Sequence, residues 1–210
     1  MATNSVFAIE SEEVGAATFG QGWQTELAVH ATPKQHQQQE IQALTDRHID
    51  LQGATNFRDM GGYANRSGER VRWGQVFRSD HLAELVAADW AQVSELGIGL
   101  VADLRNDRER ARWPSGWPDH LEVEFMMRDF EMDLRQLNEV GYHTLAYQQV
   151  ELLRGFFRTL AQPDAPRVLI HCTAGQDRTG YPCALLLALL EVPRETILQD
   201  YSLSHHQRRH

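Results

Sequence analysis

The chain has 210 residues, of which 42% are hydrophobic and 23% are charged. These values are typical of one soluble globular domain with a substantial core. Asp and Glu outnumber Lys and Arg by 29 to 20, which gives a net charge of −9. A general nucleic-acid binder carries the opposite balance, so the composition argues against a nucleic-acid partner.

Secretion and membrane insertion are also disfavoured. Residues 1–4 lack the basic start of a signal peptide, and no run approaches the ~20 apolar residues that cross a bilayer. The two cysteines, Cys172 and Cys183, do not make a disulfide framework. We therefore expect a cytoplasmic protein without integral membrane contact. Cys183 is either a small core residue or a thiol that reacts with oxidised Cys172.

The first 45 residues differ in character from the rest. Residues 35–40 are polar and low in complexity, as in a linker or the start of a solvated helix. Residues 6–9 and 25–29 are candidates for short strands. We expect an N-terminal extension or linker over residues 1–45, either docked or partly disordered, followed by one catalytic domain over residues 46–210.

Strand and helix patterns alternate through residues 46–210. The expected strands cover residues 71–77, 98–104, 121–125 and 167–171. The expected helices cover residues 82–96, 131–160 (one helix, or two with a break at Gly141), 178–190 and 193–201. This alternation predicts an α/β domain with a central, mostly parallel β-sheet flanked by helices. In such sheets the site lies at the carboxyl ends of the strands.

Residues 171–180, HCTAGQDRTG, join an expected strand to an expected helix. A loop at such a junction turns successive backbone N–H groups inward and ends at a helix N-terminus, which together bind an anion. This field favours the thiolate of Cys172, which is the nucleophilic form. Arg178 can hold two phosphate oxygens with parallel hydrogen bonds. The decapeptide therefore describes a site that cleaves phosphate esters.

The pattern Cys-x5-Arg-Thr, preceded by His, resembles the signature of the protein tyrosine phosphatase superfamily. The fuller string HCTAGxDRTG resembles a microbial branch of atypical tyrosine and lipid phosphatases. Further matches lie, in order, at residues 56–63, 77–79, 101–105 and 192–201. The resemblance implies a cysteine-phosphatase-like fold and a cysteine-dependent, metal-independent phosphomonoester hydrolase that needs no cofactor.

The resemblance implies a reaction in two steps. The Cys172 thiolate attacks phosphorus, a cysteinyl-phosphate forms, and water then hydrolyses it. His171 is expected to fix the loop and favour the thiolate, and Thr179 to hydrogen-bond the departing sulfur. The residues expected to bind the phosphate are Thr173, Ala174, Gly175, Gln176, Asp177 and Arg178.

Three aspartates are candidates for work as, or beside, the general acid that protonates the leaving oxygen. Asp177 lies inside the loop and is the usual acid in the branch that this chain resembles. Asp129 follows a strand, in the position that supplies the acid in dual-specificity phosphatases. Asp103 ends another strand and either faces the loop or orients Arg178 or a backbone amide. The tripeptide Trp-Pro-Asp at 117–119 matches another acid loop, but it precedes a strand and is treated as a coincidence.

Four residues upstream match the early motifs of the branch. Asn56, Arg58, Asp59 and Arg78 are expected to support the site from behind. Gln176 stands where the branch usually has a lysine that serves multiply phosphorylated lipid heads. A neutral amide there favours monophosphates such as phosphotyrosine.

The expected function is therefore dephosphorylation of a phosphotyrosine-type or phosphoinositide-type substrate, with a phosphorylated protein or a lipid headgroup as partner. Relatives generally continue with helices that cover the pocket. The end of this chain at residue 210 is therefore expected to leave Cys172 more exposed. The alternative function is a catalytically silent phosphate-binding module with the same fold. A sulfur transferase is a third reading, which the Arg-Thr pair after the loop disfavours.

Overall fold

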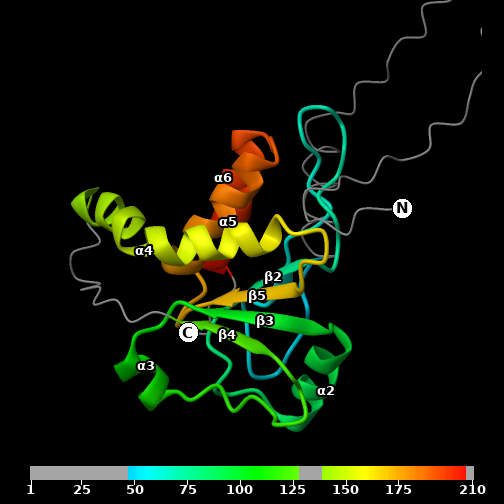
Figure 1. Ribbon diagram of the computed structural model, residues 1–210, viewed down its shortest axis with the longest axis vertical. Coiled ribbons are helices and arrows are strands. Elements are labelled where there is room, and N and C mark those ends of the chain that lie inside the picture. Colours follow the sequence, from blue (N-terminus) through cyan, green and yellow to red (C-terminus); the bar gives the residue numbers. More distant parts are fainter. Residues whose placement is uncertain (1–46, 128–138, 207–210) are drawn as a thin grey trace, which may run out of the picture.

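The computed structural model describes residues 47–127 and 139–206. It is an α/β structure whose strands and helices largely alternate (Figure 1). In chain order the elements are β1 Arg58–Asp59, β2 Val76–Ser79, α2 Ala87–Glu95, β3 Ile98–Asp103, α3 Asp107–Arg112, β4 Glu124–Met127, α4 Glu139–Leu160, β5 Arg167–His171, α5 Asp177–Leu189 and α6 Arg194–His206.

The five strands form one sheet in the order β1-β2-β5-β3-β4. Only β1 is antiparallel to its neighbour, so the predicted, mostly parallel sheet is confirmed. His171 at the end of β5 pairs with Ser79 on one side and Asp103 on the other. Because these three strands are parallel, the segments that follow them meet at one edge of the sheet.

Alternate side chains of the central strands face two different cores. Leu100 and Ala102 pack in the cluster that includes Leu152 and Phe156 of α4. Val101, between them, packs in a second buried cluster on the other face of the sheet, which contains Val93 of α2. Figure 1 accordingly shows α4, α5 and α6 on one side of the sheet and α2 and α3 on the other. A sheet covered on both faces holds its carboxyl edge in place for a site.

The predicted helix 82–96 is shorter, because α2 begins at Ala87. The backbone of residues 84–85 packs so closely on Gly53 that a Cβ there would lie 2.0 Å from the carbonyl oxygen of Glu84. Asp89 then accepts the N–H groups of Gly53 and Val86, at 2.9 and 3.0 Å. These tertiary contacts hold the preceding segment in a turn.

Other boundaries also differ from the prediction, and the final helix, predicted over 193–201, is α6, which continues to His206. The predicted strand 71–77 is β2, which starts only at Val76, since Gly74 adopts a φ of +69° that interrupts extended backbone. The predicted strand 121–125 is β4, which starts at Glu124. Gly141 lies inside α4, so the predicted break there is wrong, while residues 131–138 lie outside the described residues.

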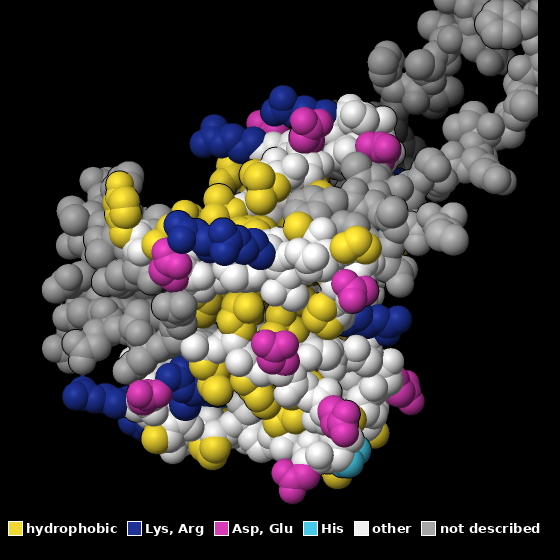
Figure 2. Space-filling view, viewed as in Figure 1, with side chains coloured by type: hydrophobic (Ala, Val, Ile, Leu, Met, Phe, Trp, Pro, Cys, Tyr) yellow, Lys and Arg dark blue, Asp and Glu magenta, His cyan; other side chains and the backbone are white. Residues whose placement is uncertain are grey.

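Within residues 47–127 and 139–206, no helix is long and apolar enough to cross a membrane. The longest, α4, carries the exposed ion pair between Glu151 and Arg154. Figure 2 shows Arg side chains that lie apart on this face, among Asp and Glu, rather than in one basic patch. The cytoplasmic location and the lack of a nucleic-acid partner stay predictions.

Candidate active site

The loop after β5 is held from behind by its carbonyl groups. The Asn56 side-chain amide donates to the carbonyl oxygens of Ala174 and Gly175, at 3.2 and 3.1 Å. Arg78 donates to the same oxygen of Gly175 at 2.8 Å. Asn56 and Arg78 thus support the loop directly, as their motifs suggested.

The hydrogen bonds that hold the loop carbonyl groups also orient the loop N–H groups. In a trans peptide the C=O and N–H point in opposite directions, so a carbonyl held from outside leaves the following N–H facing inward. The carbonyl of Thr173 is held in this way by the backbone N–H of His81 at 3.1 Å. One inward N–H is seen directly, because that of Gly175 donates to Cys172 Sγ at 3.2 Å. The Cys172 sulfur therefore lies against an inward loop N–H, and Cys172 is only 2% exposed, so the more exposed cysteine expected from the sequence is not found.

A buried ion-pair cluster stands behind this loop. Asp200 of α6 binds Arg58 at 3.0 Å and Arg78 at 2.7 Å, and all three side chains are at most 3% exposed. Burial alone would raise the pKa of Asp200, but the two guanidinium groups outweigh it and hold the pKa at about 2. Arg58 also donates to the Asn56 side-chain oxygen, which leaves the amide nitrogen of Asn56 facing the loop. Arg58 thus acts on the loop through Asn56.

Asp59 has a different place from the one expected. Its carboxylate accepts the N–H groups of Gly61 and Gly74, each at 2.7 Å. It therefore holds together the irregular segment between β1 and β2. It stabilises the edge of the sheet rather than the loop.

Arg178 is fixed by a carboxylate that the sequence analysis missed. Glu109 of α3 accepts both terminal nitrogens of Arg178 at 2.7 Å and the Thr173 hydroxyl at 2.5 Å. Burial lowers the pKa of Arg178, but the hydrogen bonds with Glu109 outweigh this effect and raise it. The guanidinium is thus charged and held beside the loop. The only sequence signal is Asn106–Glu109, a capping box that any helix start can carry.

Asp103 orients a backbone amide, as one of its expected roles required, because it accepts the Arg105 N–H at 3.0 Å; it makes no hydrogen bond to Arg178 within the described residues. Its carboxylate binds Arg105 through both oxygens, at 2.9 and 2.7 Å. His171 lies beside it, with Nε2 3.8 Å from Asp103, and its Nδ1 is 3.4 Å from the Cys172 carbonyl oxygen. Burial lowers the pKa of His171 and so favours the neutral form of its ring. His171 therefore supports the loop without adding a positive charge.

The start of α5 carries the remaining predicted residues. Asp177 is the first residue of α5 and is half-buried, and the Tyr201 hydroxyl donates to it at 3.0 Å. The expected hydrogen bond from Thr179 to the sulfur is absent, because the buried Thr179 hydroxyl oxygen has no partner within the described residues. Gln176 is also buried, directly before the helix.

Two other aspartates were considered in the sequence, and the structure describes only one of them. Asp129 lies outside the described residues. Asp119 is exposed, and its neighbour Trp117 packs edge-on against Trp90 with ring centroids 5.1 Å apart. The tripeptide 117–119 therefore has a packing role.

Comparison with known proteins places this geometry in a family. Residues 49–210 match the tyrosine phosphatase family. The chain belongs to this family.

Curated relatives agree with this assignment. A Cupriavidus necator protein named as a tyrosine-protein phosphatase is 32% identical over 194 residues, which cover 83% of this chain and 69% of that protein. The triple specificity protein phosphatase PtpB of Mycobacterium tuberculosis is 33% identical over 190 residues, covering 72% of this chain and 67% of its own length. Among solved structures, the catalytic core of Siw14 covers 75% of this chain and 79% of its own, at 13% identity and a TM-score of 0.48.

Beside the loop of this tyrosine phosphatase lies a cavity of about 310 Å³. Thr173 and Ala174 of the loop form one wall, and the segments around residues 53–55 and 80–84 form the other. Among the described residues that line it are two carboxylates, Asp80 and Glu84, and neither Lys nor Arg. The cavity beside the loop therefore has a negatively charged wall.

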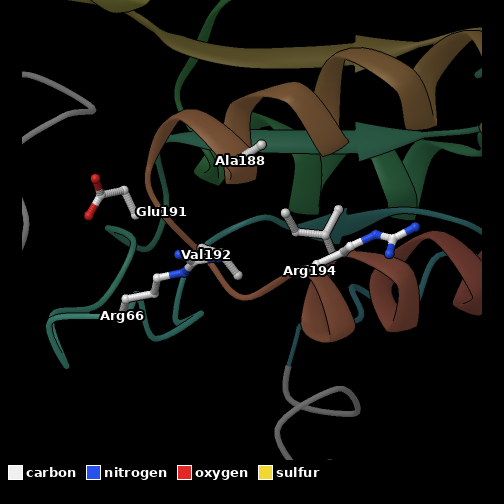
Figure 3. A pocket seen from close by; sticks show the side chains of 6 residues that line it. Arg66, Ala188, Glu191, Val192 and Arg194 are labelled. Atoms are coloured by element: carbon white, nitrogen blue, oxygen red, sulfur yellow. The ribbon is translucent and has the colours of Figure 1, made fainter.

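A second cavity, of about 420 Å³, lies where α5 turns into α6 and is not part of the phosphatase loop. Arg66, Glu191 and Arg194 border it, together with apolar side chains such as Val192 (Figure 3). Arg66 is joined to this turn, because its N–H donates to the Glu191 carbonyl at 3.1 Å. In the described part of the chain, no three His, Cys, Asp or Glu side chains gather as metal ligands.

Proposed function

We propose that this chain hydrolyses phosphate monoesters by way of a cysteinyl-phosphate on Cys172. The carrying observation is the position of the Cys172 sulfur beside an inward loop N–H, with the charged Arg178 held at the same loop. A nucleophile, amide donors and a fixed cation at one place suit an anion whose charge changes as it reacts.

The two steps balance as follows. The Cys172 thiolate forms an S–P bond, the P–O bond of the ester breaks, and the leaving oxygen takes a proton from Asp177. Water then attacks phosphorus and returns a proton to Asp177, the S–P bond breaks, and inorganic phosphate leaves with the thiolate restored. Asp129 is the alternative acid.

For the substrate we propose a monophosphate on a protein side chain, of the phosphotyrosine type, rather than a multiply phosphorylated lipid head. Gln176 in the loop is neutral, and the neighbouring cavity adds the charges of Asp80 and Glu84. Asp80 accepts backbone N–H groups of Thr55 and Asn56, yet it still adds negative charge at the cavity. Further phosphates on the substrate would be repelled there.

Hydrolysis of para-nitrophenyl phosphate tests the activity. We expect turnover that vanadate inhibits and EDTA does not, and that Cys172→Ser abolishes while Cys183→Ala, at the other cysteine, retains. Phosphate binding without any turnover by the intact protein would instead support the silent module.

Two comparisons test the acid and the substrate. The pH–rate profiles of Asp177→Asn and Asp129→Asn identify the acid. The variant that lacks the true acid should lose the basic limb of the profile. If both variants keep that limb, both assignments are wrong. Gln176→Lys should raise hydrolysis of phosphoinositides relative to a phosphotyrosine peptide. An unchanged ratio would remove Gln176 from the explanation of specificity.

A further inference from the structure

We propose that Tyr201 is a positioning residue for the general acid, and that it orients the Asp177 carboxyl for proton transfer. This inference rests on the proposed function and on Asp177 as the acid. Its starting observation is the hydrogen bond that the Tyr201 hydroxyl donates to Asp177 Oδ1 at 3.0 Å. Nothing in the motif around Cys172 points to this residue, which lies 24 positions after Asp177.

The Tyr201 ring is held against the first turn of α5. A Cβ at Gly180 would lie 2.5 Å from Cε2 and 2.9 Å from Cδ2 of this ring, so only glycine leaves room for it. Asp177 and Gly180 are three residues apart and therefore lie on the same face of the helix. One side chain thus packs on Gly180 with its ring and reaches Asp177 with its hydroxyl.

The residue before Tyr201 fixes this part of α6. Asp200 is buried in its ion pairs with Arg58 and Arg78, and Arg78 in turn holds the Gly175 carbonyl. One turn of α6 therefore contacts the phosphate loop through Asp200 and Arg78, and contacts Asp177 through Tyr201. The place of the hydroxyl is set by the same cluster that sets the loop.

The hydrogen bond selects the oxygen that carries the proton. A protonated carboxyl has one acceptor oxygen and one O–H. Because Tyr201 donates to Oδ1, the transferable proton of Asp177 resides on Oδ2. The bond also restricts rotation of the carboxyl, so that the O–H is offered to the leaving oxygen without a search.

The test is Tyr201→Phe, which keeps the ring on Gly180 and removes only the hydroxyl. The readout is kcat/KM for a series of aryl phosphates whose leaving phenols range from acidic to weakly acidic. Loss of one hydrogen bond to the acid should slow weakly acidic leaving groups about fivefold to tenfold and leave the most acidic nearly unchanged. Tyr147→Phe, at a tyrosine of α4 that is 79% exposed, is the matched control.

A double variant makes the assignment specific. If Tyr201 acts through Asp177, Asp177→Asn/Tyr201→Phe should be no slower than Asp177→Asn alone. The inference is overturned if Tyr201→Phe leaves the leaving-group dependence unchanged, if it slows every substrate equally, or if the two losses multiply. If the unaltered protein shows no Cys172-dependent hydrolysis, the proposed function itself fails.

Discussion

Glu109 holds the Arg178 guanidinium by both terminal nitrogens, each at 2.7 Å, although the two residues are 69 positions apart. The same carboxylate accepts the Thr173 hydroxyl of the loop and the backbone N–H of Asn106 at its own helix start. Glu109 therefore links α3 to the loop and to the Arg178 guanidinium. A guanidinium held in this way needs little reorganisation when a phosphate arrives.

Removing the charge of Glu109 should cost catalysis. In Glu109→Gln the amide can keep at most part of the fork, so we expect kcat/KM to fall about 10- to 100-fold, from the ~1.5–3 kcal/mol of a hydrogen bond to a charged group. Steady-state kinetics with para-nitrophenyl phosphate measures it. Glu95→Gln, at an exposed glutamate at the end of α2, is the control. Equal kcat/KM in both variants would show that Arg178 needs no partner.

Glu109 should also make stability depend on pH in the acid range. Burial raises its pKa, but hydrogen bonds from Arg178 and Thr173 outweigh this and lower it from 4.5 to about 2. A lowered carboxyl pKa stabilises the fold above pH 4.5, and this contribution is lost as the pH falls toward 2. Urea unfolding of the unaltered protein and Glu109→Gln should thus differ most above pH 5 and converge near pH 2. A constant difference would contradict the linkage.

The buried carboxylate of α6 should matter most for stability. Asp200→Asn leaves the buried Arg58 and Arg78 without a full countercharge, and breaking such a pair costs about 3–5 kcal/mol in the free energy of unfolding. Asp119→Asn removes the same charge at an exposed position and should change stability little. Urea midpoints compare the two. Equal midpoints would mean that the cluster is not needed for folding.

Substitutions at two glycines distinguish the cost of a left-handed backbone from the cost of steric overlap with an added Cβ. Gly175 has a φ of +64°, and a Cβ there would lie 2.5 Å from the Ser79 carbonyl oxygen. Gly68 has a φ of +85° with nothing within 4 Å of the added Cβ. Gly68→Ala should cost about 1–2 kcal/mol from the left-handed backbone alone. Gly175→Ala should cost more and, because the loop must shift, abolish most activity; equal losses would contradict this account.

The negative wall beside the loop should tune substrate choice. Glu84→Lys replaces an exposed carboxylate of that wall by a cation, which should raise hydrolysis of phosphoinositides relative to a phosphotyrosine peptide several-fold at low salt. The gain should shrink as salt rises. Glu122→Lys makes the same change of charge at a cavity away from the loop. The same ratio in both variants would assign the effect to net charge alone.

The strand, loop and helix around Cys172 were predictable because their signals are local. An apolar run, a glycine that adopts positive φ and a largely apolar helix each constrain only neighbouring residues. The partner of Arg178 was not predictable in this way. Glu109 lies in a short, highly charged segment with several carboxylates, and the sequence gives no reason to prefer it to Asp103 as the partner of Arg178.

Residues of the early motif at 56–59 have different roles in the structure. Asn56, Arg58 and Asp59 lie within four consecutive positions, yet the first two act on the loop while Asp59 holds a turn. The backbone enters β1 here, and alternate side chains of an extended segment point to opposite faces. A shared motif therefore does not imply a shared role.

Residue types and short spacings along the chain were enough to predict the mostly parallel α/β fold, which the structure confirms, and to single out Cys172, its loop and Arg178 as the candidate site. Only the tertiary structure decided which charges pair: Glu109 with Arg178, Asp103 with Arg105, and Asp200 with Arg58 and Arg78. The physical reason is the strand order, which places β5 between β2 and β3 and brings segments far apart in the chain to one edge. A Coulomb interaction depends on distance in space, which the order of residues along the chain does not contain.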